Sequence, residues 1–339
     1  MESIVQRDEG KRRIGEILLP SGELYNAAYS IVNAKTVAII TGFPCMLNYD
    51  PPTETDGPLG ALALAKCLLA LGKNVVIATD ECNEEVLLRC AAVTNTFKQS
   101  NPNNTSPGTL TMESFPGQAS FDIKDERRLQ QLADRVDLVI AIERSGPCQD
   151  GRYLTMRGFD MTHLLAPLDK ISVTDIKREK PPPRSIGIGD GGNEVGMGKI
   201  HSRVIGSSIT NAAEIACVVP TDHLLVCSVS NWGGYALAAA AAVVDCVTRQ
   251  QEGSDNCITS RHLSGLIFVL FVIIGQSITH KQLREQLLLC LPSDTEETAK
   301  CTAIVSAGAR DGVTGKLECW VDGMPLETSL QVLRELRDI

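Results

Sequence analysis

The sequence predicts an α/β fold of three layers, in which helices cover both faces of a mostly parallel sheet. Short β-branched runs alternate with helical segments along the 339 residues, as expected for parallel strands joined by crossover helices. Clusters of glycine and polar residues directly follow the predicted strands. Because parallel strands end at one edge of their sheet, we expect these polar loops to cluster at the carboxyl edge, where open α/β folds bind ligands.

The first predicted unit is a strand, a helix and a second strand. Residues 36–40 (TVAII) form a short β-branched run typical of a buried strand. A helix follows from Pro58 to Gly72, with Asp56 as its expected cap, and it is apolar nearly all round. Residues 75–79 supply the second strand, after which Asn-Glu-Glu opens another helix.

The remaining elements are predicted from the same signals. They are a surface loop or insertion over residues 99–118, a helix over 125–135, a strand ending at 142, a proline-rich linker over 177–184, strands over 185–188 and 223–230, an alanine-rich helix, a strand over 302–308, and a final helix over 326–336. Residues 1–21 are expected to be a tail. Only a single sheet would bring the polar clusters together, so we expect one domain over residues 1–339.

The composition excludes several classes of partner. Lysine and arginine total 32 against 41 aspartates and glutamates, so the net charge of −9 has the wrong sign for binding a phosphate backbone. Two Trp, five Tyr and seven Phe leave little for stacking on bases. The longest strongly apolar run, residues 266–274, is too short to span a bilayer. We therefore expect neither nucleic acid nor a membrane as a partner.

The twelve cysteines predict a reducing setting. None forms a C-x-x-C pair, and most lie in apolar runs, as Cys67, Cys217, Cys227 and Cys246 do, which favours reduced core residues over disulfides. The first thirteen residues lack the apolar segment of a signal peptide and are too acidic for a transit peptide. A soluble intracellular protein is predicted.

Several acidic side chains at the predicted strand ends are candidates for catalysis. Glu54 and Asp56 stand beside a helix amino terminus. A capping role is enough to explain Asp56, which makes Glu54 the better general base or metal ligand. Glu143 beside Arg144, and Asp311 beside Arg310, pair an acid with a guanidinium suited to carboxylate recognition. A mutual surface ion pair explains each of these two pairs equally well.

The loop GDGGNEVGMG, residues 189–198, is suited to a hard cation or an ammonium group. Asp190 and Glu194 are the candidate metal ligands, for Mg²⁺ or Ca²⁺, and Asn193 stands between them. A purely structural turn is the alternative, because turns favour these residue types. The carboxylate of Asp190 argues against a dinucleotide site, which would place pyrophosphate in the loop. The loop is also similar to the magnesium loop of haloacid-dehalogenase-type phosphatases, but the D-x-D-x-T nucleophile motif is missing.

From the residues alone, the prediction is an acid-rich pocket with a few arginines that binds a small zwitterionic or carboxylate ligand. The catalytic candidates are Glu54, Asp56, Glu143 and Asp311, and the substrate-binding candidates are Arg144, Ser145, Asn193, Asn231, Arg310 and Thr314. The sequence contains no H-E-x-x-H, G-x-S-x-G or G-x-x-x-x-G-K-[ST] motif, so a zinc hydrolase, a serine hydrolase and a P-loop enzyme are not indicated.

Four blocks together resemble the carboxy-terminal domain of the mammalian mitochondrial D-glutamate cyclases. They are TETDGPLGALALA, GDGGNEVGMG, ARDGVTG and WVDGMP, and the resemblance runs from about Gly22 to the end. It implies conversion of D-glutamate to 5-oxo-D-proline with loss of water in the mitochondrial matrix, and a further amino-terminal domain as partner. It implies no set of catalytic residues.

The chemistry of that reaction suggests roles for the candidate residues. Glu54 or Glu143 would accept the amine proton, Arg144 and Arg310 would hold carboxylates, and Asp190 and Glu194 would bind a divalent ion or the ammonium group. Two rivals stay open: a metal-dependent phosphatase or other hydrolase, and a non-catalytic domain that binds substrate or a partner domain.

Overall fold

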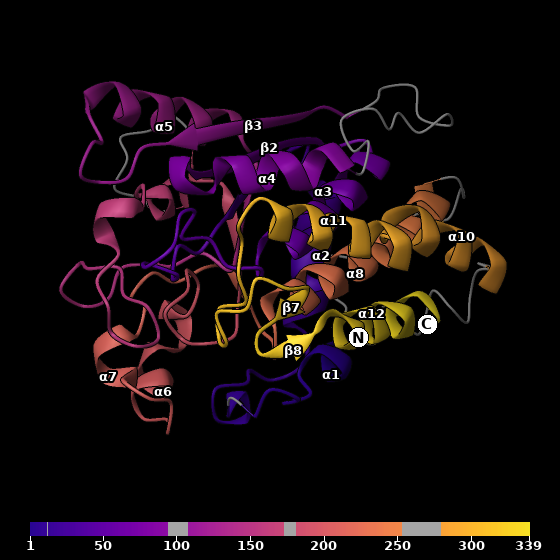
Figure 1. Ribbon diagram of the computed structural model, residues 1–339. Helices are drawn as coiled ribbons and strands as arrows, with labels where there is room; N and C mark the ends of the chain where they lie inside the picture. The colour runs from indigo at the N-terminus through magenta and orange to yellow at the C-terminus, as the bar shows by residue number, and fades with distance from the viewer. Residues whose placement is uncertain (12, 94–107, 173–180, 253–278) are drawn as a thin grey trace.

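The computed structural model contains a six-stranded sheet whose neighbouring strands are all parallel (Figure 1). It describes residues 1–11, 13–93, 108–172, 181–252 and 279–339. The strands are β1 (Thr36–Thr41), β2 (Asn74–Asp80), β3 (Leu110–Phe115), β4 (Leu138–Ile142), β5 (Arg184–Gly189) and β6 (His223–Val226), in the order β3-β2-β1-β4-β5-β6. A separate hairpin pairs β7 (Trp320–Val321) with β8 (Met324–Pro325).

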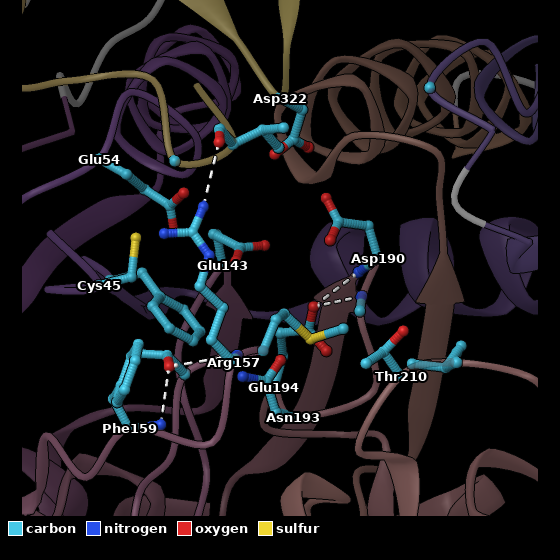
Figure 2. A pocket seen from close by; sticks show the side chains of 18 of the residues that line it. Cys45, Glu54, Glu143, Arg157, Phe159, Asp190, Asn193, Glu194, Thr210 and Asp322 are labelled. Atoms are coloured by element: carbon cyan, nitrogen blue, oxygen red, sulfur yellow. Dashed lines mark hydrogen bonds between the residues drawn. The ribbon is translucent and has the colours of Figure 1, made fainter. Parts of the chain in front are cut away.

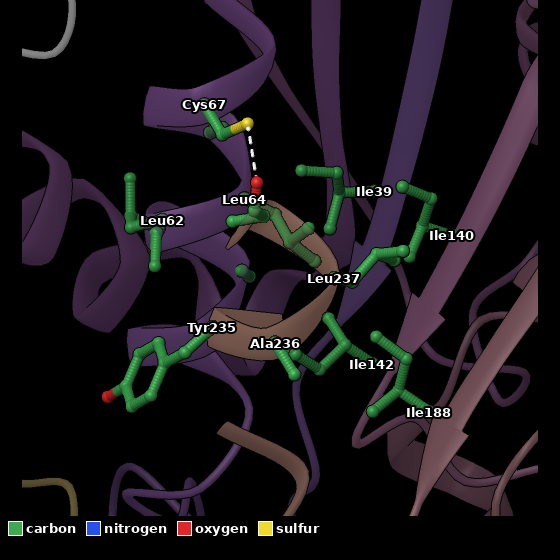
Figure 3. Packing of buried hydrophobic residues seen from close by; sticks show 14 of the residues in the cluster. Ile39, Leu62, Leu64, Cys67, Ile140, Ile142, Ile188, Tyr235, Ala236 and Leu237 are labelled. Atoms are coloured by element: carbon green, nitrogen blue, oxygen red, sulfur yellow. Dashed lines mark hydrogen bonds between the residues drawn. The ribbon is translucent and has the colours of Figure 1, made fainter. Parts of the chain in front are cut away.

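Helices cover both faces of the sheet. They are α1 (Glu2–Val5), α2 (Glu23–Asn33), α3 (Pro58–Ala70), α4 (Glu81–Val93), α5 (Ile123–Arg135), α6 (His201–Ile205), α7 (Ala212–Ile215), α8 (Ser230–Glu252), α10 (His280–Cys290), α11 (Asp294–Ser306) and α12 (Leu326–Arg337). Alternate strand residues serve the two faces: Ile39 and Ile140 pack against α3 and α8 (Figure 3), whereas Ala38 and Val139 belong to the cluster that contains α5. The three-layer α/β/α prediction is confirmed.

Helices α3 and α8 approach each other closely because both carry glycine at the crossing. A Cβ atom added at Gly234 would lie 2.9 Å from the Cα of Gly60, and one added at Gly60 would lie 2.8 Å from the Cα of Asn231. Helix α3 is buried almost throughout, as its apolar sequence predicts. The close crossing brings the amino ends of these two helices together at the carboxyl edge of the sheet.

Two expectations about strands are wrong. Residues 110–115, expected within a surface loop, form the edge strand β3, whose partly polar sequence hides the strand pattern. Residues 302–306, expected as a strand, continue helix α11, which begins with a capping box between Ser293 and Glu296. A short apolar run such as TAIV fits either state, and here helical spacing buries Cys301 and Ile304 on one face.

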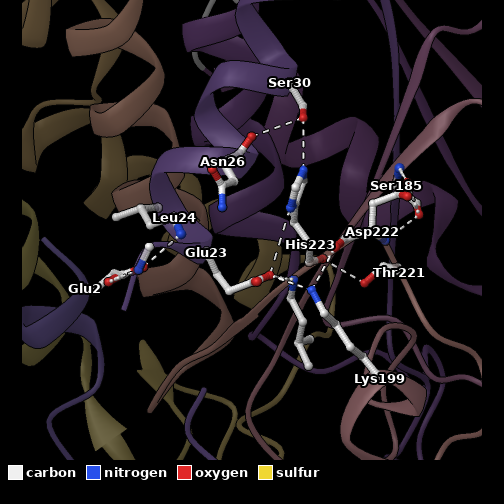
Figure 4. Close-up of polar contacts among 12 residues, drawn as sticks. Glu2, Glu23, Leu24, Asn26, Ser30, Ser185, Lys199, Thr221, Asp222 and His223 are labelled. Carbon is white, nitrogen blue, oxygen red and sulfur yellow. Dashed lines mark hydrogen bonds and ion pairs between the residues drawn. The ribbon is translucent and has the colours of Figure 1, made fainter. Parts of the chain in front are cut away.

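The amino-terminal residues do not form a loose tail. Val5, Ile14 and Ile17 are buried in the core. The Glu2 carboxylate accepts hydrogen bonds from the backbone of Gly22 and Leu24, at 3.1 and 2.8 Å, and so ties the first helix to the start of α2. Figure 4 shows this contact beside the neighbouring polar cluster of Glu23, Lys199 and His223.

Other expectations fall partly outside the described residues. The apolar run 266–274, much of the 99–118 segment and most of the 177–184 linker lie there. Strand β6 ends at Val226, before the expected limit of 230. Among the described residues, no helix is both long and apolar enough to cross a membrane, and the cysteines are all unbridged.

Candidate active site

A cavity of about 520 Å³ opens at the carboxyl edge of the sheet (Figure 2). Strands β1 and β4 are neighbours whose following strands lie on opposite sides, and such a switch in strand order is where open α/β folds bind ligands. Loops after β1, β4 and β5 supply Phe43, Glu54, Glu143, Asp190 and Asn193. The rest of the wall includes Lys11, Arg13, Thr155, Arg157, Phe159, Thr210, Gly312, Val313 and Asp322.

Asp56 and Asn231 cap each other's helices beneath this cavity. The Asp56 carboxylate accepts from the backbone N–H groups of Ser230 and Asn231, both at 2.9 Å, at the start of α8. The Asn231 side-chain oxygen accepts in return from Gly57 and Gly60, at 3.0 and 2.7 Å, at the start of α3. Asp56 therefore caps α8 and not α3 as expected, and Asn231, expected to bind substrate, is a buried cap that does not line the cavity.

Three buried carboxylates converge where the two helices meet. One oxygen each from Asp56, Glu143 and Asp190 lies within 4.8 Å of the others. Ser230 joins the group: its hydroxyl donates to Glu143 at 2.6 Å, and its backbone N–H reaches Asp190 at 3.3 Å. Such proximity requires either shared protons or a cation.

Burial raises the proton affinity of this cluster. The pKa of Asp56 is raised to about 8, first because burial disfavours its charged form and second because Asp322 adds negative charge. The pKa of Glu143 is also well above its ordinary value, through burial and then the charge of Glu194. Groups with these properties hold protons at neutral pH and can exchange them with a substrate.

Glu194, expected to bind a metal ion with Asp190, instead organises its own loop. Its carboxylate accepts three backbone N–H groups, from Asp190, Gly191 and Gly192, at 2.9, 2.6 and 2.7 Å. The glycine-rich loop thus wraps around an internal anion, which satisfies the backbone donors that an external ligand would use. Of the expected pair, only Asp190 belongs to the convergent group of three.

Glu54 lines the cavity from the loop after β1 and is nearly fully buried. Its carboxylate lies against Gly312, where an added Cβ would fall 1.8 Å from the Glu54 Oε2 atom. Backbone hydrogen bonds join the two segments, since Thr55 donates to Arg310 at 2.9 Å and Arg310 donates to Thr53 at 3.1 Å. The loop with the ARDG block thus reaches the site from the end of a helix, α11.

The two arginines expected to bind carboxylates have other partners. Arg144 is buried and forms a two-pronged ion pair with Asp80, and Arg310 lies 3.9 Å over the ring of Tyr49 and donates to the Gly315 carbonyl. Neither lines the cavity. The guanidinium of Arg144 binds a carboxylate, but that carboxylate is Asp80 inside the fold.

The other candidates divide between wall and scaffold. Asn193 lines the cavity and donates to the Leu154 carbonyl at 2.8 Å. Asp311 accepts from the backbone of Thr314 and Gly323, at 2.8 Å each, and so closes its own loop. Ser145 is buried. Asp311, Thr314 and Ser145 do not line the cavity.

Sequence reasoning missed Asp322 and Arg157. Asp322 occupies the turn of the β7–β8 hairpin with a φ of 50°, and the Asp-Gly pair there is a known hairpin signal. Arg157 stands in a loop without any motif, so only the folded chain places it in the cavity wall. Lys11 and Arg13 were missed because their segment was expected to be a tail.

Comparisons with known proteins identify the family of this chain. A family model described as "D-glutamate cyclase-like, C-terminal" matches residues 1–337. The human protein named "D-glutamate cyclase, mitochondrial" is 33% identical over 343 aligned positions, which include the whole of this chain and 51% of the human protein. The chain thus spans about half the length of this relative. Because the family model covers nearly every residue, the chain belongs to the D-glutamate cyclase-like C-terminal family.

Proposed function

We propose that this chain catalyses the cyclisation of D-glutamate to 5-oxo-D-proline. The main support is the group of buried carboxylates, with the raised pKa values of Asp56 and Glu143. Two of its members, Glu143 and Asp190, line a cavity whose wall also contains Glu54 and a cation, Arg157. The name of the human relative agrees with this activity.

The reaction defines what the site must do. The amine nitrogen forms a bond to the γ-carboxyl carbon, and one oxygen of that carboxyl leaves as water. The ammonium group gives up two protons, and the departing oxygen takes two. An enzyme therefore needs a base near the amine and an acid near the γ-carboxyl group.

The cavity offers both kinds of group. Glu143 lines the cavity and Asp56 lies beneath it, and both hold their protons near neutral pH because their pKa values are raised. Glu143 is therefore the acid that we propose for protonating the departing oxygen. Glu54 also lines the cavity and is the base that we propose for the amine. Asp190 completes the acidic group and stabilises positive charge at the substrate.

The same three carboxylates match the ligands that Mg²⁺ and Ca²⁺ prefer, and we propose them as the ligands if a divalent ion takes part. When bound, such an ion would neutralise the cluster and polarise the γ-carboxyl group. The grouped carboxylates also support the rival function, a metal-dependent hydrolase, for which turnover of a generic phosphoester would be the positive result.

The human relative suggests a partner domain and a cellular compartment for this chain. The human protein carries about as much sequence again, and we propose a domain from that additional length as the partner of this one. Its name includes the word mitochondrial, and we propose the same compartment here, in which the unbridged cysteines would stay reduced.

The test is an assay of 5-oxoproline formation from D-glutamate, with and without a chelator. We expect Glu143→Gln to lower kcat by about 10²- to 10⁴-fold, the range for losing a general acid or base. The matched control is Glu285→Gln, an exposed glutamate on α10 that does not line the cavity and should keep wild-type kcat. Absence of product with or without the chelator would contradict the proposal, and binding without turnover would favour the non-catalytic rival.

A further inference from the structure

Arg157 is a cation in a cavity wall that contains five acidic residues. It belongs to the loop that follows Thr155, and its side chain crosses the pocket to the loop after α11 (Figure 2). There one guanidinium nitrogen, Nη2, donates to the Val313 carbonyl at 3.1 Å. The side chain therefore joins two walls of the cavity.

No carboxylate of the described residues lies within ion-pair distance of the Arg157 guanidinium. Arg157 differs in this respect from Arg144, which forms a buried ion pair with Asp80. It also differs from Arg152 in the same loop, which pairs with Asp150 at 2.8 Å. A guanidinium has five N–H donors, and the Val313 carbonyl takes one of them. The fork that suits a planar carboxylate thus keeps donors for a ligand.

The position of Arg157 relative to Glu54 suggests which carboxylate it binds. Glu54 lies against Gly312, and Arg157 bonds to the next residue, Val313, so both side chains meet one short stretch of chain. In an α-amino acid the amine and the α-carboxylate share one carbon. If Glu54 faces the amine, the α-carboxylate must lie close by, whereas the γ-carboxyl group faces Asp56 and Glu143.

We propose that Arg157 binds the α-carboxylate of the substrate and makes the cavity selective for amino acids with two carboxyl groups. This inference rests on the proposed cyclase function. It assigns Arg157 to substrate selection, in contact with the part of the substrate that does not react. The guanidinium fork of Arg157 and the proton-holding Glu143 both line the cavity, so one pocket can hold the α-carboxylate and act on the γ-carboxyl group.

The experiment compares D-glutamate with its α-carboxamide, D-isoglutamine, which keeps the reacting amine and γ-carboxyl group but lacks the α charge. A hydrogen-bonded ion pair contributes about 1.5–3 kcal/mol, so we expect wild type to favour D-glutamate in kcat/KM by about 10- to 150-fold. Arg157→Gln should reduce this ratio toward one, mainly through a higher KM for D-glutamate. Arg157→Lys should keep part of the ratio, because it retains charge without the fork.

The matched control is Arg152→Gln, which removes a guanidinium from the same loop but outside the cavity wall. It should keep the wild-type ratio between the two substrates. A general loss of folding would lower turnover of both substrates alike, so the ratio isolates recognition of the α-carboxylate. A wild-type ratio in Arg157→Gln would overturn the inference.

Calorimetric binding of glutarate separates this inference from the proposed function. Glutarate has two carboxylates and no amine, so it binds without cyclising. If wild type forms no 5-oxoproline but binds glutarate at least tenfold more tightly than Arg157→Gln does, the cyclase function is wrong and the carboxylate site stands. If glutarate binds both proteins equally, or binds neither, the carboxylate site is wrong.

Discussion

Two sets of buried carboxylates in this protein differ in what balances their charge. In the core, Glu297 forms an ion pair with Lys300, and Asp80 forms one with Arg144, with all four side chains almost fully buried. At the cavity, no lysine or arginine of the described residues lies within 4.0 Å of Asp56 or Glu143. The difference separates acids that stabilise the fold from acids whose charge is left for a ligand or a proton.

The neutral partners of the cavity acids support that distinction. Asp56 accepts backbone N–H groups, from Ser230 and Asn231 of α8 and from Gly57, and Glu143 accepts the hydroxyl of Ser230. Such donors orient a carboxylate without cancelling its charge. Because a buried charge without a countercharge is costly, these acids take up protons, and their raised pKa values express that cost.

The largest loss of stability is expected from breaking one of the buried ion pairs in the core. Lys300→Met leaves Glu297 as a buried charge without its ion pair and removes the hydrogen bond to the Leu59 carbonyl. We expect it to lower the free energy of unfolding by about 3–5 kcal/mol, as measured by denaturant titration. The control is Lys66→Met, which breaks the partly exposed pair with Glu296 at 2.9 Å and should cost about 0–1 kcal/mol. An equal loss of unfolding free energy in the two variants would show that burial does not make the Lys300–Glu297 pair more important for stability.

The acids without a countercharge, Asp56 and Glu143, should make the stability of the protein depend on pH. The pKa of Asp56 is about 8 in the folded protein against an ordinary value of 3.8, so between these values the folded state holds a proton that the unfolded state lacks. Stability therefore falls as pH rises through this window, at up to about 1.4 kcal/mol per pH unit. From pH 6.0 to 7.5, wild type should lose about 2 kcal/mol relative to Asp56→Asn.

Denaturant titrations of both proteins at the two pH values measure this difference. Asparagine keeps one acceptor oxygen for the start of α8, so the variant should retain the fold, which circular dichroism checks. A difference between wild type and variant that stays constant over the window would show that Asp56 titrates normally.

Much of the fold, but only part of the site, could be predicted from sequence. The β-branched runs at β1, β2 and β4 are local signals, and the parallel arrangement then places Glu54, Glu143 and Asp190 at one edge. The partner of a charged side chain is not a local property. Arg144 follows β4 and could have faced a ligand, and only the packed sheet brings it to Asp80 at the end of β2, two strands away.

Gly312 allows a test of Glu54, the base proposed at the cavity wall. An alanine there would press on the Glu54 carboxylate, the movable end of a side chain, so we expect displacement of Glu54 with little loss of stability. If Glu54 is the base, kcat should fall roughly tenfold, equivalent to about 1.4 kcal/mol. The matched control is Gly315→Ala in the same loop, where an added Cβ meets nothing within 4 Å but where the φ of 72° costs stability. Unchanged kcat in Gly312→Ala would remove Glu54 from the mechanism.

The smallest effect is expected at Arg310, which by sequence resembles a ligand-binding residue but in the structure contacts a ring and a backbone carbonyl of the fold. Its guanidinium lies over Tyr49 and donates to the Gly315 carbonyl, outside the cavity wall. Arg310→Met should therefore cost about 0.5–1 kcal/mol of unfolding free energy, through the lost ring contact, and leave the KM for D-glutamate within about twofold of wild type. Michaelis–Menten kinetics beside Arg157→Gln measure the contrast directly. If the KM rises equally in both variants, Arg310 binds substrate despite its contacts with Tyr49 and Gly315. Contacts inside the fold would then not distinguish structural arginines from ligand-binding ones in this protein.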